Sequence, residues 1–256
     1  MAELPRAEEY RHLIEENFSG KTIAIVQVDE VVLLRENSRE KLRSMLIGKK
    51  MGPVFRYGKM LFASLGKNKG FILFHFGPEG FPVVGGDGTL SPKCVFSMGF
   101  TDGSFLWVIN ERRIGEIGWV KDKEDFIRRR KYGPDALVIT EKQFLNNIRR
   151  RRSCIKALLN NQNIVAGIGN AYADEILFRS GLHPQLPMNM ISTESLRKVY
   201  KNIREVMSEA LTPEGSAGHF FVRNRKAGIP CPACHTPLTQ KYVQSRSSYF
   251  CPNCQP

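Results

Sequence analysis

Four cysteines near the end of the chain restrict its fold most. They form two Cys-x-x-Cys pairs, Cys231 with Cys234 and Cys251 with Cys254, separated by sixteen residues. This spacing is typical of a tetrahedral zinc site with four thiolate ligands. The residues between the pairs alternate as two short strands do, so the sequence predicts a β-hairpin held by one structural Zn²⁺. Four thiolates leave no open coordination position, which argues against a catalytic metal.

Two disulfide bonds are the alternative use of the same cysteines. No charged-then-apolar signal segment opens the chain, which favours the metal site. Cys94 and Cys154 are isolated, and we expect both to be buried, inert thiols. No apolar run approaches the roughly 18 residues that a membrane-spanning helix needs, so we expect a soluble protein in a reducing compartment.

The charge of the chain is strongly positive and unevenly distributed. The 256 residues carry a formal net charge of +13 at pH 7. No acidic residue lies between Lys142 and Ala173, and none lies between Gly215 and Pro256. One basic stretch is often only a solvated face, but two acid-free stretches favour a nucleic acid backbone as the partner. A membrane surface is disfavoured, because no amphipathic helix with exposed large apolar residues is evident.

The periodicity divides the chain into a β-rich part and a helical part. Residues 4–18 have helical spacing, and short β-rich runs follow as far as Trp119. We expect an α+β protein with an N-terminal helix and antiparallel β-sandwich (1–125), a helical domain (126–215) and the zinc hairpin (216–256). The expected β runs are 22–33, 52–65, 71–76, 93–100 and 105–109, and the expected helical runs are 139–159, 171–180 and 193–211.

A Gly-x-Gly-Asn turn leads into one of the expected helices, in the segment from Asn161 to Phe178. Such a turn exposes backbone N–H groups and the positive end of a helix dipole, which suits a phosphate. The segment resembles the helix, two-turn, helix motif of the formamidopyrimidine-DNA glycosylase and endonuclease VIII family. The four-cysteine hairpin is similar to the zinc finger of that family. Further matches are Glu3-Leu4-Pro5, Arg56 to Lys59, His75 to Gly77, Arg112-Arg113 and Val222 to Cys231.

The resemblance implies a base-excision DNA repair glycosylase. In that family the initiator methionine is removed, and the amine of residue 2 attacks C1′ of a flipped-out damaged nucleotide. The resulting Schiff base can then drive strand scission as an AP lyase. The usual nucleophile is proline, whereas this chain has Ala2. The imine of a primary amine can lose its proton, so we expect base excision to be retained better than the lyase step.

The resemblance also assigns further catalytic residues. Glu3 matches the acid/base carboxylate beside the amine, and Lys59 matches a hairpin lysine that reaches the phosphates and sugar near the lesion. Arg246 matches the finger arginine that grips the phosphates of the lesion, although the glycines beside it in the family are serines here. Arg6 stands where the family usually has a second glutamate, which reverses a charge near the site.

Other matched residues imply how the duplex is held. Arg112 matches the family residue that fills the gap left by the flipped nucleotide. The methionine and phenylalanine usual beside that residue are replaced by Pro78 and Ile114. The expected partner is double-stranded DNA with damaged bases or abasic sites, bound by a monomer in the bacterial cytoplasm at the nucleoid, or otherwise inside a cell. The expected phosphate clamps are Arg151, Arg152, Lys156 and Asn170, with Arg246.

A second interpretation keeps the fold without the catalysis. Arg6, Pro78 and the changed finger loop favour a non-catalytic binder of damaged, abasic or distorted DNA, whereas Ala2 followed by Glu3 favours the enzyme. A zinc-ribbon RNA-binding protein would explain the charge and the cysteines. It would not explain the family-like residues at the start of the chain.

Overall fold

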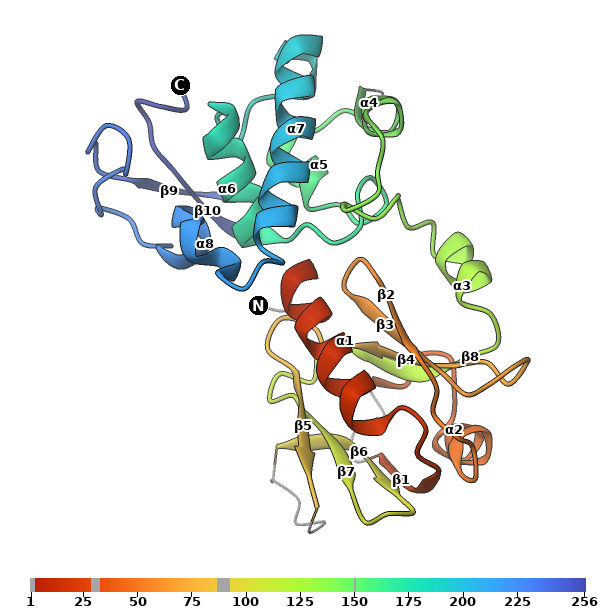
Figure 1. The fold of residues 1–256 in the computed structure, drawn as a ribbon. Helices are drawn as coiled ribbons and strands as arrows, with labels where there is room; N and C mark the ends of the chain where they lie inside the picture. The colour runs from red at the N-terminus through yellow and green to blue at the C-terminus, as the bar shows by residue number, and fades with distance from the viewer. Residues whose placement is uncertain (1–2, 29–32, 87–92, 150) are drawn as a thin grey trace. The chain divides into compact units, whose positions relative to one another are not determined.

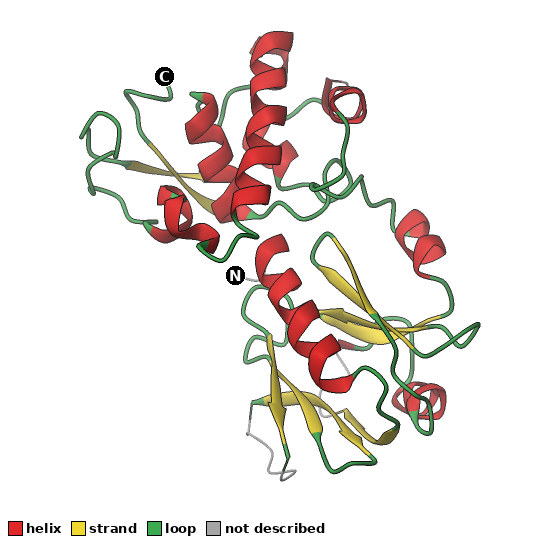
Figure 2. Ribbon diagram, viewed as in Figure 1, coloured by secondary structure: helices red, strands yellow, loops and turns green. Residues whose placement is uncertain are grey.

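The computed structural model describes residues 3–28, 33–86, 93–149 and 151–256. The chain divides into two compact units, Met1–Arg130 and Lys131–Pro256, which are taken in turn (Figure 1). Helices and strands mix in the first unit, and helices dominate the second (Figure 2). Among the described residues, none of the helices combines the length and the apolar character that crossing a membrane requires.

The first unit is a β-sandwich accompanied by helices. Its two sheets have the strand orders β1-β6-β7-β5 and β2-β3-β4-β8, and all their pairings are antiparallel. The expected sandwich and the expected helix over 4–18 are therefore confirmed. The elements are α1 (Leu4–Phe18), β1 (Ile23–Val28), α2 (Arg39–Leu46), β2 (Val54–Tyr57), β3 (Met60–Ser64), β4 (Phe71–His75), β5 (Phe81–Gly85), β6 (Cys94–Phe100), β7 (Phe105–Ile109), β8 (Glu116–Val120) and α3 (Lys123–Arg129).

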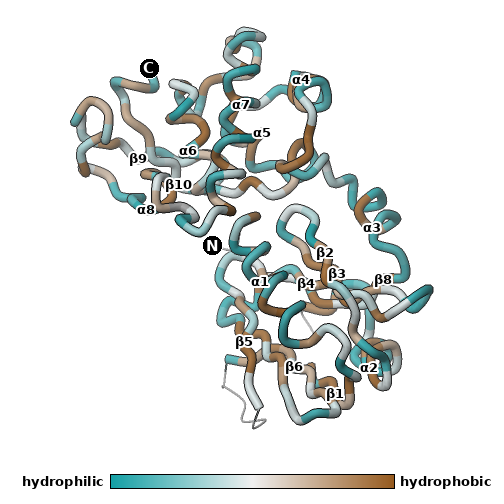
Figure 3. The backbone as a smooth tube through the Cα atoms, in the orientation of Figure 1, coloured by the Kyte–Doolittle hydropathy of each residue, from teal (hydrophilic) through white to brown (hydrophobic). Residues whose placement is uncertain are grey.

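The core of this unit lies between the two sheets and under α1. Phe74 of one sheet meets Phe96 of the other edge to face, with ring centroids 6.1 Å apart. Ile14 and Phe18 of α1 are fully buried in the same cluster, and Phe18 stacks on Phe100 at 4.6 Å. The hydrophobic stretches of the backbone follow the sandwich strands (Figure 3). Burial of these rings fixes α1, and with it the start of the described chain, against the sandwich.

Two strands and two short helices of this unit were not expected from the sequence. Pro82 interrupts the strand signal of β5, but β5 pairs only with β7, and an edge strand tolerates a proline. The helix α2 begins after Ser38, whose side chain accepts a hydrogen bond from the Lys41 N–H at 3.2 Å. It buries only Leu42 and Leu46, which is too short a pattern to read from the sequence.

The second unit packs helices around α6 and ends in a two-stranded hairpin. The expected helix over 139–159 is two helices, because residues 151–154 leave the helix and Cys154 bridges to Pro187. Cys154 is therefore only half-buried, contrary to expectation, whereas Cys94 is buried as expected. Gly181 ends α6 in the left-handed conformation, with φ of 71°. The elements are α4 (Glu141–Arg149), α5 (Ile155–Leu159), α6 (Asn170–Ser180), η2 (Met188–Met190), α7 (Thr193–Glu209), η3 (Gly215–Gly218), α8 (Phe220–Arg223), β9 (Thr239–Val243) and β10 (Arg246–Phe250).

Candidate nucleic-acid interface and metal centre

The four expected metal ligands come together at one end of the β9–β10 hairpin. The Sγ atoms of Cys231, Cys234, Cys251 and Cys254 all lie within 4.8 Å of one another. The Sγ of Cys234 is 3.4 Å from those of Cys251 and Cys254, and Cys231 Sγ is 3.9 Å from Cys254 Sγ. These separations are far longer than a disulfide bond of about 2.05 Å. The disulfide alternative is therefore excluded for these pairs.

The sulfur positions fit a tetrahedral metal ion. With metal–sulfur bonds of about 2.3 Å, the edge of the tetrahedron is about 3.8 Å, close to the separations above. Cys231 and Cys251 are buried with Phe221 and Leu238 in a small apolar cluster. Phe178 of α6 contacts Phe221 with ring centroids 4.7 Å apart. The cluster can hold a metal ion, and its apolar support joins it to the helices.

The opposite end of the hairpin carries Arg246. Val243 and Arg246 are paired, so Gln244 and Ser245 form a two-residue turn. Their φ angles are 47° and 61°, which is the type I′ pattern that glycine and asparagine usually supply. Arg246 is exposed and directly follows this strained turn. The residues after the turn, rather than glycines in it, must therefore fix the position of Arg246.

A buried carboxylate holds the strand that follows Arg246. Asp174 Oδ1 lies 2.6 Å from Lys156 Nζ and accepts a hydrogen bond from Ser248 Oγ at 3.0 Å. Asp174 Oδ2 accepts a hydrogen bond from the Tyr249 N–H at 3.2 Å and pairs with Arg225 Nη1. The carboxylate thus joins α5, α6, β10 and the segment that leads into the finger.

The backbone carbonyl of Ser247 accepts a second set of hydrogen bonds. It accepts hydrogen bonds from Asn170 Nδ2 at 2.8 Å, Arg225 Nη2 at 2.8 Å and Lys156 Nζ at 3.1 Å. A carbonyl oxygen has two lone pairs, so three donors share it. The Oδ1 atom of Asn170 is buried and has no hydrogen-bond partner among the described atoms.

This arrangement corrects the expectation for Lys156. Its side chain has no exposed area, because it lies between Asp174 and the Ser247 carbonyl. It therefore cannot reach a phosphate in this structure, and it supports the finger instead. Asn170 is the first residue of α6, one residue before the expected helical run 171–180, and it is only 4% exposed, with its amide directed at the same carbonyl. Arg151 and Arg152 are exposed after α4, so they remain available to a phosphate.

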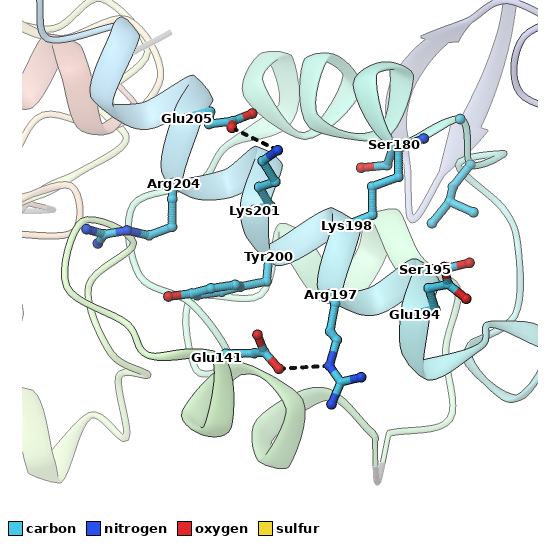
Figure 4. Close-up of a pocket in the computed structure, with 12 residues that line it drawn as sticks. Glu141, Ser180, Glu194, Ser195, Arg197, Lys198, Tyr200, Lys201, Arg204 and Glu205 are labelled. Carbon is cyan, nitrogen blue, oxygen red and sulfur yellow. Dashed lines mark hydrogen bonds and ion pairs between the residues drawn. The ribbon is translucent and has the colours of Figure 1, made fainter.

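A polar hollow lies where the turns before α6 meet the finger. Its volume is about 410 Å³, and Arg246 and Gln244 line it on the hairpin side. The residues on the helical side are Ser153, Ala157, Leu158, Asn160, Asn161 and Gln162. Amides, a hydroxyl and one guanidinium make a lining rich in hydrogen-bond donors, which suits an anion. A larger hollow on α7 is lined by pairs such as Arg197 with Glu141 at 2.9 Å, and none of the expected site residues lines it (Figure 4).

Two of the expected catalytic residues lie at adjacent parts of the first unit. Ala2 lies outside the described residues. Glu3 is the N-cap position of α1 and is 2% exposed, and its carbonyl accepts the Ala7 N–H at 2.9 Å. Lys59 occupies the two-residue turn between β2 and β3 together with Gly58, whose φ of 58° fits the first position of a type II′ turn.

A partly buried ion pair joins this turn to α1. Arg56 Nε donates to Glu8 Oε2 at 2.9 Å, and Arg56 Nη1 donates to the Gly58 carbonyl at 2.9 Å. The Arg56 side chain is 8% exposed. The turn that carries Lys59 is therefore held at a fixed place relative to the helix that carries Glu3. Sequence reasoning singled out Arg56 only as part of a motif, without this role.

Lys59 also acts electrostatically on His75 at the end of β4. Burial lowers the pKa of His75 to about 4, and the positive charges of Lys59 and Arg35 add to this effect. The imidazole is therefore neutral at pH 7. Gly77, two residues after His75, has φ of 67°. A Cβ atom at this position would lie 1.7 Å from the Ile114 carbonyl oxygen. The turns after β4 and β7 thus touch backbone to backbone.

Arg112 lies at the exposed tip of the turn after β7. Its Nη2 is 2.8 Å from Glu79 Oε1 on the neighbouring turn. Asn110 Nδ2 donates to the carbonyls of Phe76 at 3.1 Å and Ile114 at 2.9 Å, which locks the two turns together. Ile114 is 50% exposed beside Arg112. Glu79 was not singled out from the sequence, because an acid in a turn carries no signal by itself.

Comparisons with known proteins agree with this geometry. The family model described as "Formamidopyrimidine-DNA glycosylase N-terminal domain" matches residues 1–117. The model described as "Formamidopyrimidine-DNA glycosylase H2TH domain" matches residues 132–221. The formamidopyrimidine-DNA glycosylase of Solibacter usitatus is 33% identical over 270 residues, which cover 100% of this chain and 99% of that protein.

Two solved structures with the same fold are complexes with DNA. The Lactococcus lactis formamidopyrimidine-DNA glycosylase, non-covalently bound to DNA containing an AP site, has a TM-score of 0.91 at 26% identity. MutM in complex with DNA containing carbocyclic 8-oxo-G has a TM-score of 0.90 at 25% identity. Each comparison covers 99% of both chains. With its two matched domains and its full-length relatives, the chain belongs to the formamidopyrimidine-DNA glycosylase family.

Proposed function

We propose that this protein is a base-excision DNA repair glycosylase that removes damaged bases from double-stranded DNA. The observation that carries the proposal is the full-length match to named glycosylases, combined with the placement of Glu3 and Lys59 on two elements tied by Arg56. The non-catalytic interpretation is accordingly not favoured.

The proposed chemistry begins with the amine of Ala2 after removal of Met1. The amine attacks C1′ of a flipped-out nucleotide, the glycosidic bond breaks, and the base leaves with a proton. Glu3 would assist by proton transfer at the sugar, and Lys59 would bind the phosphates and sugar. The expected weakness of the lyase step rests on the primary amine of Ala2, whose imine can be neutral and then draws electrons less strongly.

DNA binding is proposed to use both units. Arg112 would enter the gap left by the flipped nucleotide, and Arg246, Arg151 and Arg152 would bind phosphates. Because the side-chain amide of Asn170 holds the Ser247 carbonyl, Asn170 would contribute through the backbone N–H groups at the start of α6. We further propose that residues 126–215 and 216–256 act as a helical domain and a zinc finger, that the protein works as a monomer, and that it acts on the DNA of the bacterial nucleoid.

Zinc is the ion proposed for the four-cysteine cluster. Four thiolates at tetrahedral spacing suit Zn²⁺, and such a closed site is structural. Cys231, Cys234, Cys251 and Cys254 would hold the metal end of the hairpin and thereby support the strand that carries Arg246.

Borohydride trapping on a duplex with one abasic site tests the proposed nucleophile. The expected result is a covalent adduct that mass spectrometry locates on a peptide beginning at Ala2. Retention of Met1, or strong binding without any adduct, would contradict the enzyme interpretation.

Glu3→Gln tests the proposed acid/base role. Loss of the carboxylate should lower the rate of base excision at least about a hundredfold, while the dissociation constant for DNA changes little. Glu16→Gln is the matched control, because Glu16 lies on the same helix and is 73% exposed. Equal activity of the two variants would remove Glu3 from the mechanism.

A further inference from the structure

The β9–β10 hairpin is anchored at two separate ends. The four cysteines flank the end where Phe250 pairs with Thr239, whereas Arg246 pairs with Val243 at the turn. A two-stranded hairpin is only marginally stable in water, so a metal at one end does not by itself fix the other. The contacts made by residues 247–249 therefore decide where Arg246 lies.

These contacts converge on Asp174 of α6. Both carboxylate oxygens of Asp174 bind two donors each, and the donors are Lys156, Ser248, Tyr249 and Arg225. The Ser247 carbonyl, directly after Arg246, is held by Lys156, Asn170 and Arg225. Every residue of β10 from 247 to 249 is thus bound to this cluster.

The charge of the cluster makes its geometry specific. One carboxylate faces two cations, and the side chains of Asp174 and Lys156 have no exposed area. Water cannot replace a lost partner at such a site, so a buried charge left without its partner is strongly unfavourable. These contacts hold the strand against α6 with Ser248 and Tyr249 on Asp174. Arg225 adds a stacking contact, with its guanidinium carbon 4.9 Å from the centre of the Tyr249 ring.

We propose that Asp174 and Arg225 are positioning residues that fix Arg246 for phosphate binding, as an anchor of the finger separate from the metal. This inference rests on the proposed function, in which Arg246 grips DNA. Neither residue needs to touch DNA for this role. If they act only through Arg246, their contribution to affinity disappears when Arg246 is absent.

A double-mutant cycle between Arg225→Gln and Arg246→Ala tests the inference. The dissociation constant of the full chain for an abasic-site duplex is measured at one salt concentration. Arg246→Ala should weaken binding about tenfold in the parent protein and less than about threefold in the Arg225→Gln background. The matched control is Arg223→Gln, which removes the same charge from an exposed arginine nearby. Its effect should simply multiply with that of Arg246→Ala.

Zinc content and the thermal unfolding midpoint are measured for each variant to separate positioning from unfolding. Ser248→Ala provides a milder test, because it removes one hydrogen bond to Asp174 and keeps every charge. In the Ser248→Ala background, Arg246→Ala should weaken DNA binding less than it does in the parent protein, and the zinc content should stay at one ion per chain.

The possible failures are distinguishable. Multiplicative effects of Arg225→Gln and Arg246→Ala overturn the positioning role and leave the proposed function intact. Loss of zinc from Arg225→Gln contradicts the separation of the two anchors. If Arg246→Ala leaves the affinity of the parent unchanged, the proposed DNA grip of Arg246 is wrong and the inference falls with it, whereas adduct formation at Ala2 remains a separate question.

Discussion

The Nζ atom of Lys156 lies 2.6 Å from Oδ1 of Asp174, and neither side chain has any exposed area. The pair belongs to α5 and α6 and supports the strand that follows Arg246. A lysine in this position stabilises the finger and does not meet the solvent.

Lys156→Met should therefore lower the free energy of unfolding of the second unit by about 3 kcal/mol, because it removes one partner of a buried ion pair. Both tryptophans, Trp107 and Trp119, belong to the first unit, so far-ultraviolet circular dichroism together with tryptophan fluorescence distinguishes the two units. The control Lys198→Met, at an exposed position of α7, should change stability by less than about 0.5 kcal/mol. Similar losses in both variants would contradict the structural role of Lys156.

Removal of the metal should separate DNA binding from the stability of the first unit. A strong chelator should unfold the β9–β10 hairpin and weaken binding to abasic-site DNA at least about tenfold, because metal binding and folding are coupled in such fingers. The fluorescence-detected melting of the sandwich should stay unchanged. Cys251→Ser should reproduce the chelated state, whereas Cys154→Ser should keep both zinc and affinity. A sandwich that melts early on chelation would show that the metal supports more than the finger.

The stability of the first unit should depend on pH through His75. Because burial holds the pKa of His75 at about 4, below its usual value, the fold favours the neutral imidazole. As the pH falls from about 6.5 to about 4, the unfolded chain binds a proton on His75 and the folded protein does not. The free energy of unfolding is therefore unaffected by His75 above pH 6.5 and decreases over this window. Urea midpoints followed by tryptophan fluorescence should fall over this window, and His75→Gln should flatten the dependence. His12→Gln, on an exposed histidine of α1, should not flatten it.

Gly77→Ala should disrupt the contact between the turns after β4 and β7. A Cβ at Gly77 would lie 1.7 Å from the Ile114 carbonyl oxygen, so the backbone must move in addition to adopting a strained φ. Gly103→Ala is a matched control, because Gly103 has φ of 85° with no atom within 4 Å of a Cβ. The control should cost about 1 kcal/mol and Gly77→Ala at least about twice that. Equal costs would mean that the two turns adjust freely.

Glu79→Gln should raise DNA affinity about twofold to threefold at low salt. The carboxylate repels phosphates and pairs with Arg112, which is then less available to the duplex. The gain should shrink when Arg112 is replaced by Ala. Glu111→Gln is the control, since Glu111 precedes Arg112 in the turn after β7 but pairs with Lys93, which lies before β6. Equal gains from both glutamines would indicate general electrostatics and no specific role for the Glu79–Arg112 pair.

Local patterns predicted the elements that rely on local signals. The helix from Leu4 to Phe18 follows from the spacing of its apolar residues, and the metal cluster follows from the spacing of its cysteines. The strand β5 was not predicted, because Pro82 is tolerated only at the edge of a sheet, and the sequence does not show which strand lies at the edge. The interruption before α5 was not predicted either, because the pairing of Cys154 with Pro187 links residues far apart in the sequence.

The sequence by itself determined which four cysteines gather at one site, the order of the β-rich and helical parts, and the residues that match a DNA glycosylase. Only the tertiary structure decided what those residues contact. The basic stretch around Lys156 predicts that this residue binds a phosphate. In the structure, α5 and α6 pack against a strand 91 residues away, and Lys156 contacts Asp174 and the Ser247 carbonyl instead. The physical reason is that burial decides whether a cation meets solvent or a carboxylate, and burial depends on segments distant in the chain.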